Sequence, residues 1–98
     1  MEKRRPAIKF TPEYKVLLYT MVSLRNQAGR TQNDMAKAMG LSQSEVSKCE
    51  RGRRVINPVE LRLYAQGIGM DFPRFVTIYE ENLKSGSSGT WIKQKRTY

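Results

Sequence analysis

The stretch "RTQNDMAKAMGLSQSEVSKCERG", residues 30–52, contains the same start signal twice, eleven residues apart. In each case a hydroxyl residue, Thr31 or Ser42, is followed three positions later by an acid, Asp34 or Glu45. This spacing is typical of a capping box, in which the two side chains bond the backbone N–H groups at a helix start. We therefore expect two short helices in close succession.

Only residues 40–42 separate these two predicted helices. Gly40 can adopt a left-handed backbone without steric cost and therefore ends the first helix. Ala36 is small enough to let the helices approach, and Val46 and Cys49 are spaced to pack onto the corner between them. A connection this tight prevents an antiparallel arrangement, so the stretch predicts a helix-turn-helix.

Three further helices are predicted from two kinds of signal, Pro near a helix start and Gly at a helix end. They are expected from Thr11 to Gly29, from Asn57 to Gly67 or Gly69, and from Asp71 through Leu83. The predicted fold is all-α, with five helices in one domain over residues 12–84. Residues 1–11 form a basic N-terminal arm, and residues 85–98 form a Gly/Ser linker and a basic tail that is either a short strand or disordered.

The charge of the chain favours an anionic partner. Eighteen Lys and Arg against nine Asp and Glu give 98 residues a net charge of +9. Residues 1–11, 12–84 and 85–98 each carry a net +3, so the two arms are dense in charge. Nucleic acid is the leading partner for such a chain, and a well-solvated basic surface is the alternative.

Composition argues against several other classes. Cys49 is the single cysteine and there is no histidine, so we expect no intramolecular disulfide, no metal, no cofactor and no catalytic residues. No apolar run is long enough for a membrane span, and the N-terminus does not resemble a signal peptide. We expect a cytoplasmic, nucleoid-associated protein of bacterial or phage-like origin that is not an enzyme.

The third predicted helix sorts its charges by face. Successive side chains of a helix are rotated by about 100°, which gathers five polar or basic residues within an arc of about 140°. The two acids, Glu45 and Glu50, lie outside this arc. The side chains within that arc are Gln43, Ser44, Ser47, Lys48 and Arg51. A helix that faces DNA needs this separation because carboxylates would be repelled, whereas a merely solvated helix usually mixes signs.

Each polar side chain of this arc can bond to DNA. Gln43 can form two hydrogen bonds with adenine in the major groove, although a solvated surface glutamine is the alternative. Ser44 and Ser47 can contact bases or phosphates, and Lys48 can contact guanine or a phosphate. The residues expected at the DNA backbone are Gln32, Ser42, Arg51, Arg53 and Arg54.

With these residues, the stretch resembles the lambda-repressor/Cro superfamily of helix-turn-helix regulators, and within it the group related to the xenobiotic-response-element repressor. The resemblance spans roughly residues 22–76. The matching residues are Thr31, Gln32, Ala36, Gly40, Ser42, Gln43, Val46, Ser47, Glu50 and Gly52.

The resemblance implies specific roles. Residues matching Gln43, Ser44, Ser47 and Lys48 face DNA bases in that family, and the residue matching Gln32 contacts a phosphate. It also implies a partly buried ion pair between Arg25 and Glu50. Cys49 departs from the larger apolar residue that the family has at its position, and we expect it to be a small core residue.

We expect a transcriptional regulator of the repressor type that binds a pseudo-palindromic operator as a homodimer. The fifth helix and the tail with Trp91 are the candidates for dimerisation, and the N-terminal arm is expected either in the minor groove or in non-specific attraction to DNA. An antitoxin that regulates its own synthesis through the same domain and binds a toxin with its tail is the alternative. An RNA-binding module is less well supported, because no RNA-stacking platform is evident.

Overall fold

The computed structural model describes residues 11–86, which form five helices and no strand. The helices are α1 (Pro12–Gln27), α2 (Gln32–Met39), α3 (Gln43–Glu50), α4 (Pro58–Gly67) and α5 (Phe72–Gly86). The predicted all-α, five-helix fold is therefore confirmed. Residues 1–10 and 87–98, which include most of the predicted arm and the tail with Trp91, lie outside the described residues.

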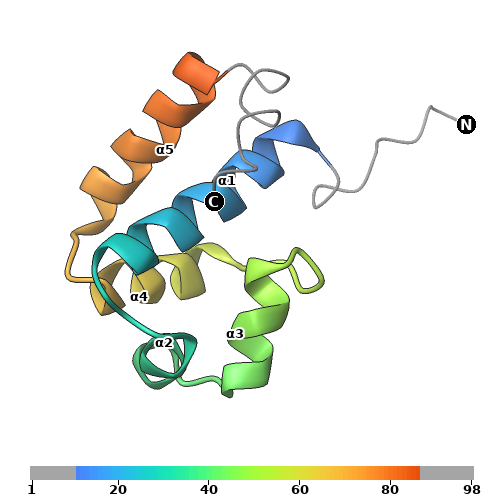
Figure 1. The fold of residues 1–98 in the computed structure, drawn as a ribbon, viewed down its shortest axis with the longest axis vertical. Coiled ribbons are helices and arrows are strands. Elements are labelled where there is room, and N and C mark those ends of the chain that lie inside the picture. Colours follow the sequence, from blue (N-terminus) through green and yellow to red (C-terminus); the bar gives the residue numbers. More distant parts are fainter. Residues whose placement is uncertain (1–10, 87–98) are drawn as a thin grey trace, which may run out of the picture.

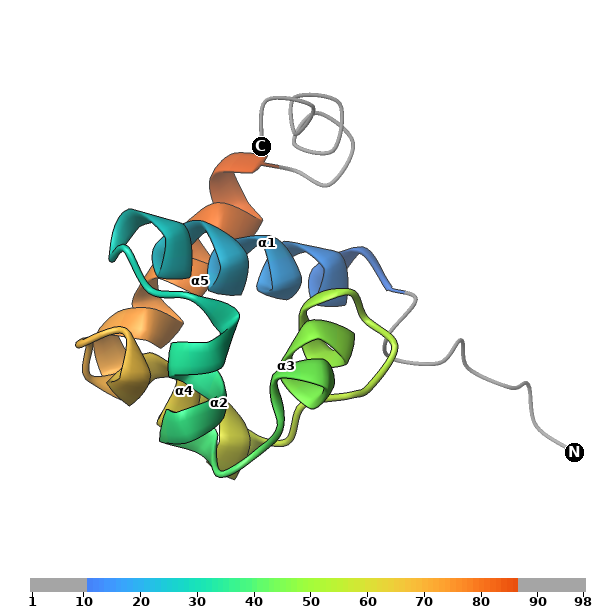
Figure 2. The same cartoon turned by 60° about the horizontal axis from the view of Figure 1, so that its bottom comes forward.

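The helices form two groups that share one core (Figure 1). Helix α1 packs against α5 on one side and α3 on the other, while α2 packs against both α3 and α4. Helix α4 also contacts α5 and completes the enclosure of the core. Figure 2 brings forward the side of the molecule formed by α2 and α3. The helix-turn-helix thus occupies one end of the domain, and α1, α4 and α5 support it from behind.

The predicted capping boxes set the helix starts. The Thr31 and Ser42 hydroxyls accept from the backbone N–H groups of Asp34 (3.0 Å) and Glu45 (3.1 Å). The two carboxylates accept in return from the backbone N–H of Thr31 and Ser42, which lowers the pKa of both acids. The Asn57 side chain begins α4 in the same way. These local bonds explain why the sequence predicts the starts well.

Helix ends follow the glycines less closely. Gly40 has the expected left-handed backbone (φ 70°), and Leu41 N–H donates to the Ala36 carbonyl across it. Helix α5 runs to Gly86, so its last two residues overlap the linker that is predicted to begin at Ser85.

The core lies between all five helices and is mostly aliphatic and aromatic. Its fully enclosed side chains include Met21, Met35, Val46, Cys49, Tyr64 and Phe75. Gly67 lies against α2, where an added Cβ would approach Ala38 Cβ to 2.9 Å. Glycine at this position therefore allows α4 to lie close to α2. None of the helices in residues 11–86 has the length and hydropathy needed to cross a lipid bilayer.

Candidate nucleic-acid interface

One face of α3 is polar and exposed, and the other is buried. Gln43, Ser44 and Lys48 are exposed and Ser47 is half-buried. On the opposite side, Val46 is completely buried. The apolar side therefore holds the helix on α2 while the polar side faces solvent.

Both acids of α3 are withdrawn from that polar face. Glu45 is bonded to the backbone N–H of Ser42 at the start of the helix. The side chain of Glu50 is only 4% exposed. The face itself therefore consists of neutral hydrogen-bonding groups and cations.

Glu50 is the centre of a buried hydrogen-bond network. Its Oε2 accepts from Arg25 Nε at 2.7 Å and from the Tyr64 hydroxyl at 2.8 Å. Its Oε1 accepts from Arg25 Nη2 and from Gln32 Nε2, each at 2.9 Å. Burial opposes the charge on Arg25, but the bonds to Glu50 raise its pKa above the ordinary value. The structure thus contains the Arg25–Glu50 ion pair, which connects α1 to α3.

Two members of this network were not foreseen from the sequence. Tyr64 has no predicted role, and Gln32 is expected only as a phosphate contact. Burial and the neighbouring carboxylate of Glu50 raise the pKa of Tyr64, so its hydroxyl remains a donor. The sequence signal for Tyr64 was weak, because a tyrosine among apolar residues of a helix does not indicate which group its hydroxyl will bond.

Gln32 connects the buried carboxylate to the exposed face. Its Nε2 donates to Glu50, and its Oε1 accepts from Gln43 Nε2 at 2.6 Å. Two residues predicted to contact DNA, one on each helix of the motif, are therefore brought together. The amide of Gln43 is consequently oriented by the protein.

The three arginines after α3 have different surroundings. Arg51 donates from Nε to the Ser47 carbonyl at 3.3 Å and is exposed, as is Arg53. Arg54 instead bonds Glu60 through both of its terminal nitrogens, at 3.0 and 2.8 Å, and its Nη1 lies 3.2 Å from Cys49 Sγ.

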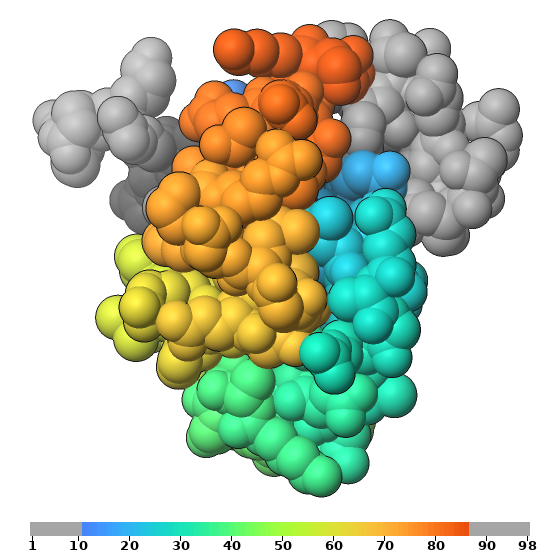
Figure 3. Space-filling model, turned by 90° about the vertical axis from the view of Figure 1, so that its left-hand side faces the viewer, coloured from blue at the N-terminus to red at the C-terminus, as the bar shows by residue number. Residues whose placement is uncertain are grey.

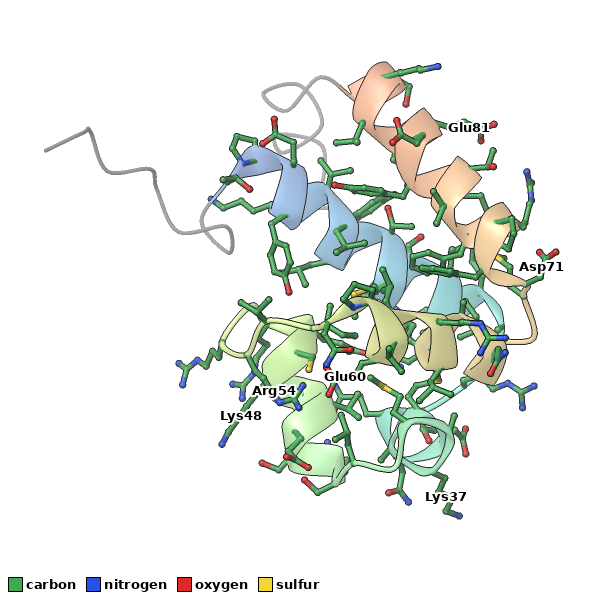
Figure 4. The ribbon with its side chains drawn as sticks, turned by 180° about the vertical axis from the view of Figure 1, so that it is seen from behind. Lys37, Lys48, Arg54, Glu60, Asp71 and Glu81 are labelled. Atoms are coloured by element: carbon green, nitrogen blue, oxygen red, sulfur yellow. The ribbon has the colours of Figure 1, made fainter. Side chains whose placement is uncertain are left out.

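Figure 4 shows Arg54 and Glu60 directed toward one another between α3 and α4, while Lys48 points away from the domain. The bonds from Arg54 lower the pKa of Glu60, and those to Glu60 raise the pKa of Arg54. The expectation that Arg54 contacts the DNA backbone did not include this pairing. The structure gives its guanidinium a partner within the protein, because Glu60 at the start of α4 lies opposite it.

Cys49 is a small core residue, as expected. It lies on the buried side of α3, and this burial raises the pKa of its thiol despite the neighbouring Arg54. Within residues 11–86, no cluster of three or more His, Cys, Asp or Glu side chains could hold a metal ion.

Comparison with known proteins agrees with this geometry. A model of the helix-turn-helix domain family matches residues 22–74, which cover α2, α3, α4, the end of α1 and the start of α5. The chain is also 40% identical over 60 residues to the uncharacterized HTH-type transcriptional regulator y4dJ of Sinorhizobium fredii (strain NBRC 101917 / NGR234). This match covers 59% of the present chain and 75% of the relative. No solved structure gives a significant match. The chain belongs to the helix-turn-helix domain family.

Proposed function

We propose that this protein is a sequence-specific regulator of transcription that binds double-stranded DNA through α3. The observation that carries the proposal is the polar face of Gln43, Ser44, Lys48 and the half-buried Ser47, from which both acids of the helix are withdrawn. The similarity to an HTH-type transcriptional regulator supports the same function. A face of this kind can enter the major groove and approach base edges without repelling phosphates.

The orientation of the Gln43 amide favours adenine as its base. One N–H of Nε2 is directed to Gln32, which leaves one N–H donor and the Oε1 acceptor for DNA. In the major groove adenine presents one acceptor and one donor, whereas guanine presents two acceptors. We therefore expect Gln43 to prefer an A·T pair over a G·C pair.

The contacts to the DNA backbone are proposed for residues around this face. Gln32 and Ser42 lie at the starts of α2 and α3, where backbone N–H groups favour a phosphate. Arg51 and Arg53 are exposed cations just after α3. Arg54 also lies in this loop, but its pairing with Glu60 suits it better to shaping the loop than to binding phosphate.

We propose further that the protein represses transcription by covering a promoter as a homodimer. Apolar surface on the α4 and α5 face supports this, since Val76 is 37% exposed beside a groove of about 310 Å³. The groove is lined by Leu17, Ile56, Pro58, Leu61, Phe72, Phe75, Val76, Tyr79 and Glu80. Figure 3 shows this side of the molecule, with α5 directly beside α4. A second copy of the chain would cover this surface.

Selection of binding sites from random duplex DNA tests the DNA-binding function. We expect enrichment of a pseudo-palindrome whose half-sites lie about 34 Å apart, as two recognition helices on one side of the duplex require. RNA of the same sequence should compete poorly. Failure to enrich any sequence would contradict the proposal.

Sedimentation equilibrium tests the dimer separately. Val76→Glu should shift the protein toward the monomer because it puts a charge beside the apolar groove. Val55→Glu is the matched control, because Val55 is 50% exposed but does not line the groove. An unchanged mass for Val76→Glu would exclude this face as the dimer interface.

A further inference from the structure

We infer that Tyr64, which lies behind the DNA-binding face, is a positioning residue for base recognition. Its buried hydroxyl fixes the carboxylate of Glu50, and that carboxylate fixes the amides of Gln32 and Gln43. The inference rests on the proposed DNA-binding function and extends it to a residue of α4 that does not touch DNA.

Tyr64 is completely buried, and its hydroxyl has two acceptors within reach. Glu50 Oε2 lies at 2.8 Å and the Met21 carbonyl at 3.0 Å. A hydroxyl has one proton, and the shorter bond to a charged acceptor is the stronger of the two. The hydroxyl therefore donates its proton to Glu50 and not to the Met21 carbonyl, and this bond holds the carboxylate in place.

The carboxylate of Glu50 is held at both oxygens. Oε2 has donors from Arg25 and Tyr64, and Oε1 has donors from Arg25 and Gln32. These donors come from α1, α2 and α4, so the position of the carboxylate depends on how these three helices are placed relative to α3. Removing the Tyr64 hydroxyl leaves Oε2 with Arg25 as its remaining donor and holds the carboxylate less firmly.

This position determines which end of each amide faces outward. Because Oε1 is only an acceptor, it must face the NH₂ group of Gln32 and not its oxygen. The Gln32 oxygen then faces Gln43 and selects the NH₂ group of that side chain. The buried charge of Glu50 therefore determines, through Gln32, which donor and which acceptor Gln43 offers to DNA.

The test compares Tyr64→Phe with the wild-type protein on two duplexes. One is the selected operator, and the other carries G·C at the A·T pair whose preference Gln43→Ala abolishes. We expect Tyr64→Phe to reduce the ratio of the two affinities about three- to tenfold, as is typical of mutations along a coupling network. At operator positions that Gln43→Ala leaves selective, Tyr64→Phe should keep the base preference, because the side chain that it positions does not read them.

Thr20→Val is the matched control. It also removes a buried hydroxyl, but this one donates to the Val16 carbonyl and accepts from Asn82 of α5, and it does not bond to Glu50. This variant should keep the wild-type ratio. A loss of the ratio in Thr20→Val equal to that in Tyr64→Phe would overturn the inference in favour of general destabilisation.

A second measurement needs no DNA. In the free protein, the side-chain amide resonances of Gln32 and Gln43 should move toward those of solvated glutamine in Tyr64→Phe and stay in place in Thr20→Val. Unchanged resonances in folded Tyr64→Phe would refute the relay even if the wild-type protein binds DNA specifically. Conversely, the resonances could shift in Tyr64→Phe although the wild-type protein shows no sequence preference. This result would support the hydrogen-bond connection from Tyr64 to Gln43 and refute the proposed function.

Arg25→Lys provides the same test if Tyr64→Phe does not fold. It keeps the positive charge but loses the two-pronged geometry that holds both oxygens of Glu50. The affinity ratio should again fall, while base preference is kept at operator positions that Gln43→Ala leaves selective. An equal loss of preference at those positions would overturn the inference.

Discussion

Replacing Arg25 by methionine should destabilise the domain strongly, because it leaves the Glu50 carboxylate buried without its charged partner. The two side chains are only 12% and 4% exposed. Breaking a buried ion pair by removing one partner costs about 3–5 kcal/mol. Glu50 retains the donors Gln32 and Tyr64, so we expect the lower end, about 3 kcal/mol.

A loss of this size is large for a small domain. Domains of this kind unfold with a total of about 5–15 kcal/mol, and each 1 kcal/mol lowers Tm by about 4–8 °C. Urea unfolding followed by circular dichroism would measure the change, with the exposed Arg74→Met as a control. Arg25→Met combined with Glu50→Leu should be less destabilising than the sum of the single variants, since the unpaired charge is gone. A loss below about 1 kcal/mol for Arg25→Met would refute this reasoning.

Three further predictions concern the loop after α3 and Cys49 on the buried side of that helix. Arg53→Ala should weaken binding to all duplexes similarly and reduce the slope of log affinity against log salt by about one, as measured by fluorescence anisotropy. Because Arg54 lowers the pKa of Glu60, their pairing should stabilise the fold above the ordinary glutamate pKa of about 4.5 and be lost as pH falls below it. Glu60→Gln should therefore flatten the fall in Tm between pH 5 and the acid limit, which thermal melts at a series of pH values would record. The thiol of Cys49, whose pKa is raised by burial, should react with a disulfide reagent far more slowly in the native protein than in urea at pH 8. Equal rates in the two states would contradict the burial of Cys49.

The helix starts could be predicted from sequence because their causes are local. Each capping box involves residues three positions apart, and Gly40 needs only its own freedom at positive φ to end α2. The polar face of α3 is predictable for the same reason, since helical periodicity alone places Gln43 and Lys48 on one side.

Apart from the Arg25–Glu50 pair, which the family resemblance implied, the sequence did not reveal contacts between residues distant along the chain. The hydroxyl of Tyr64 reaches Glu50 only because α4 packs closely against α2, and that approach depends on the absence of a side chain at Gly67. The pairing of Gln32 with Gln43 depends in the same way on the angle between two helices. Composition could not identify these partners, because it specifies which groups need hydrogen bonds and not which ones supply them.

The central claim is that the exposed face of α3 recognises DNA sequence, and Gln43→Ala tests it most directly. The measurement is the affinity of the wild-type and variant proteins for the selected operator with each of the four base pairs at every position. We predict that Gln43→Ala loses about 1–3 kcal/mol on the operator and no longer distinguishes the bases at one A·T pair, while other positions keep their preference. An unchanged base preference at every position would contradict the account.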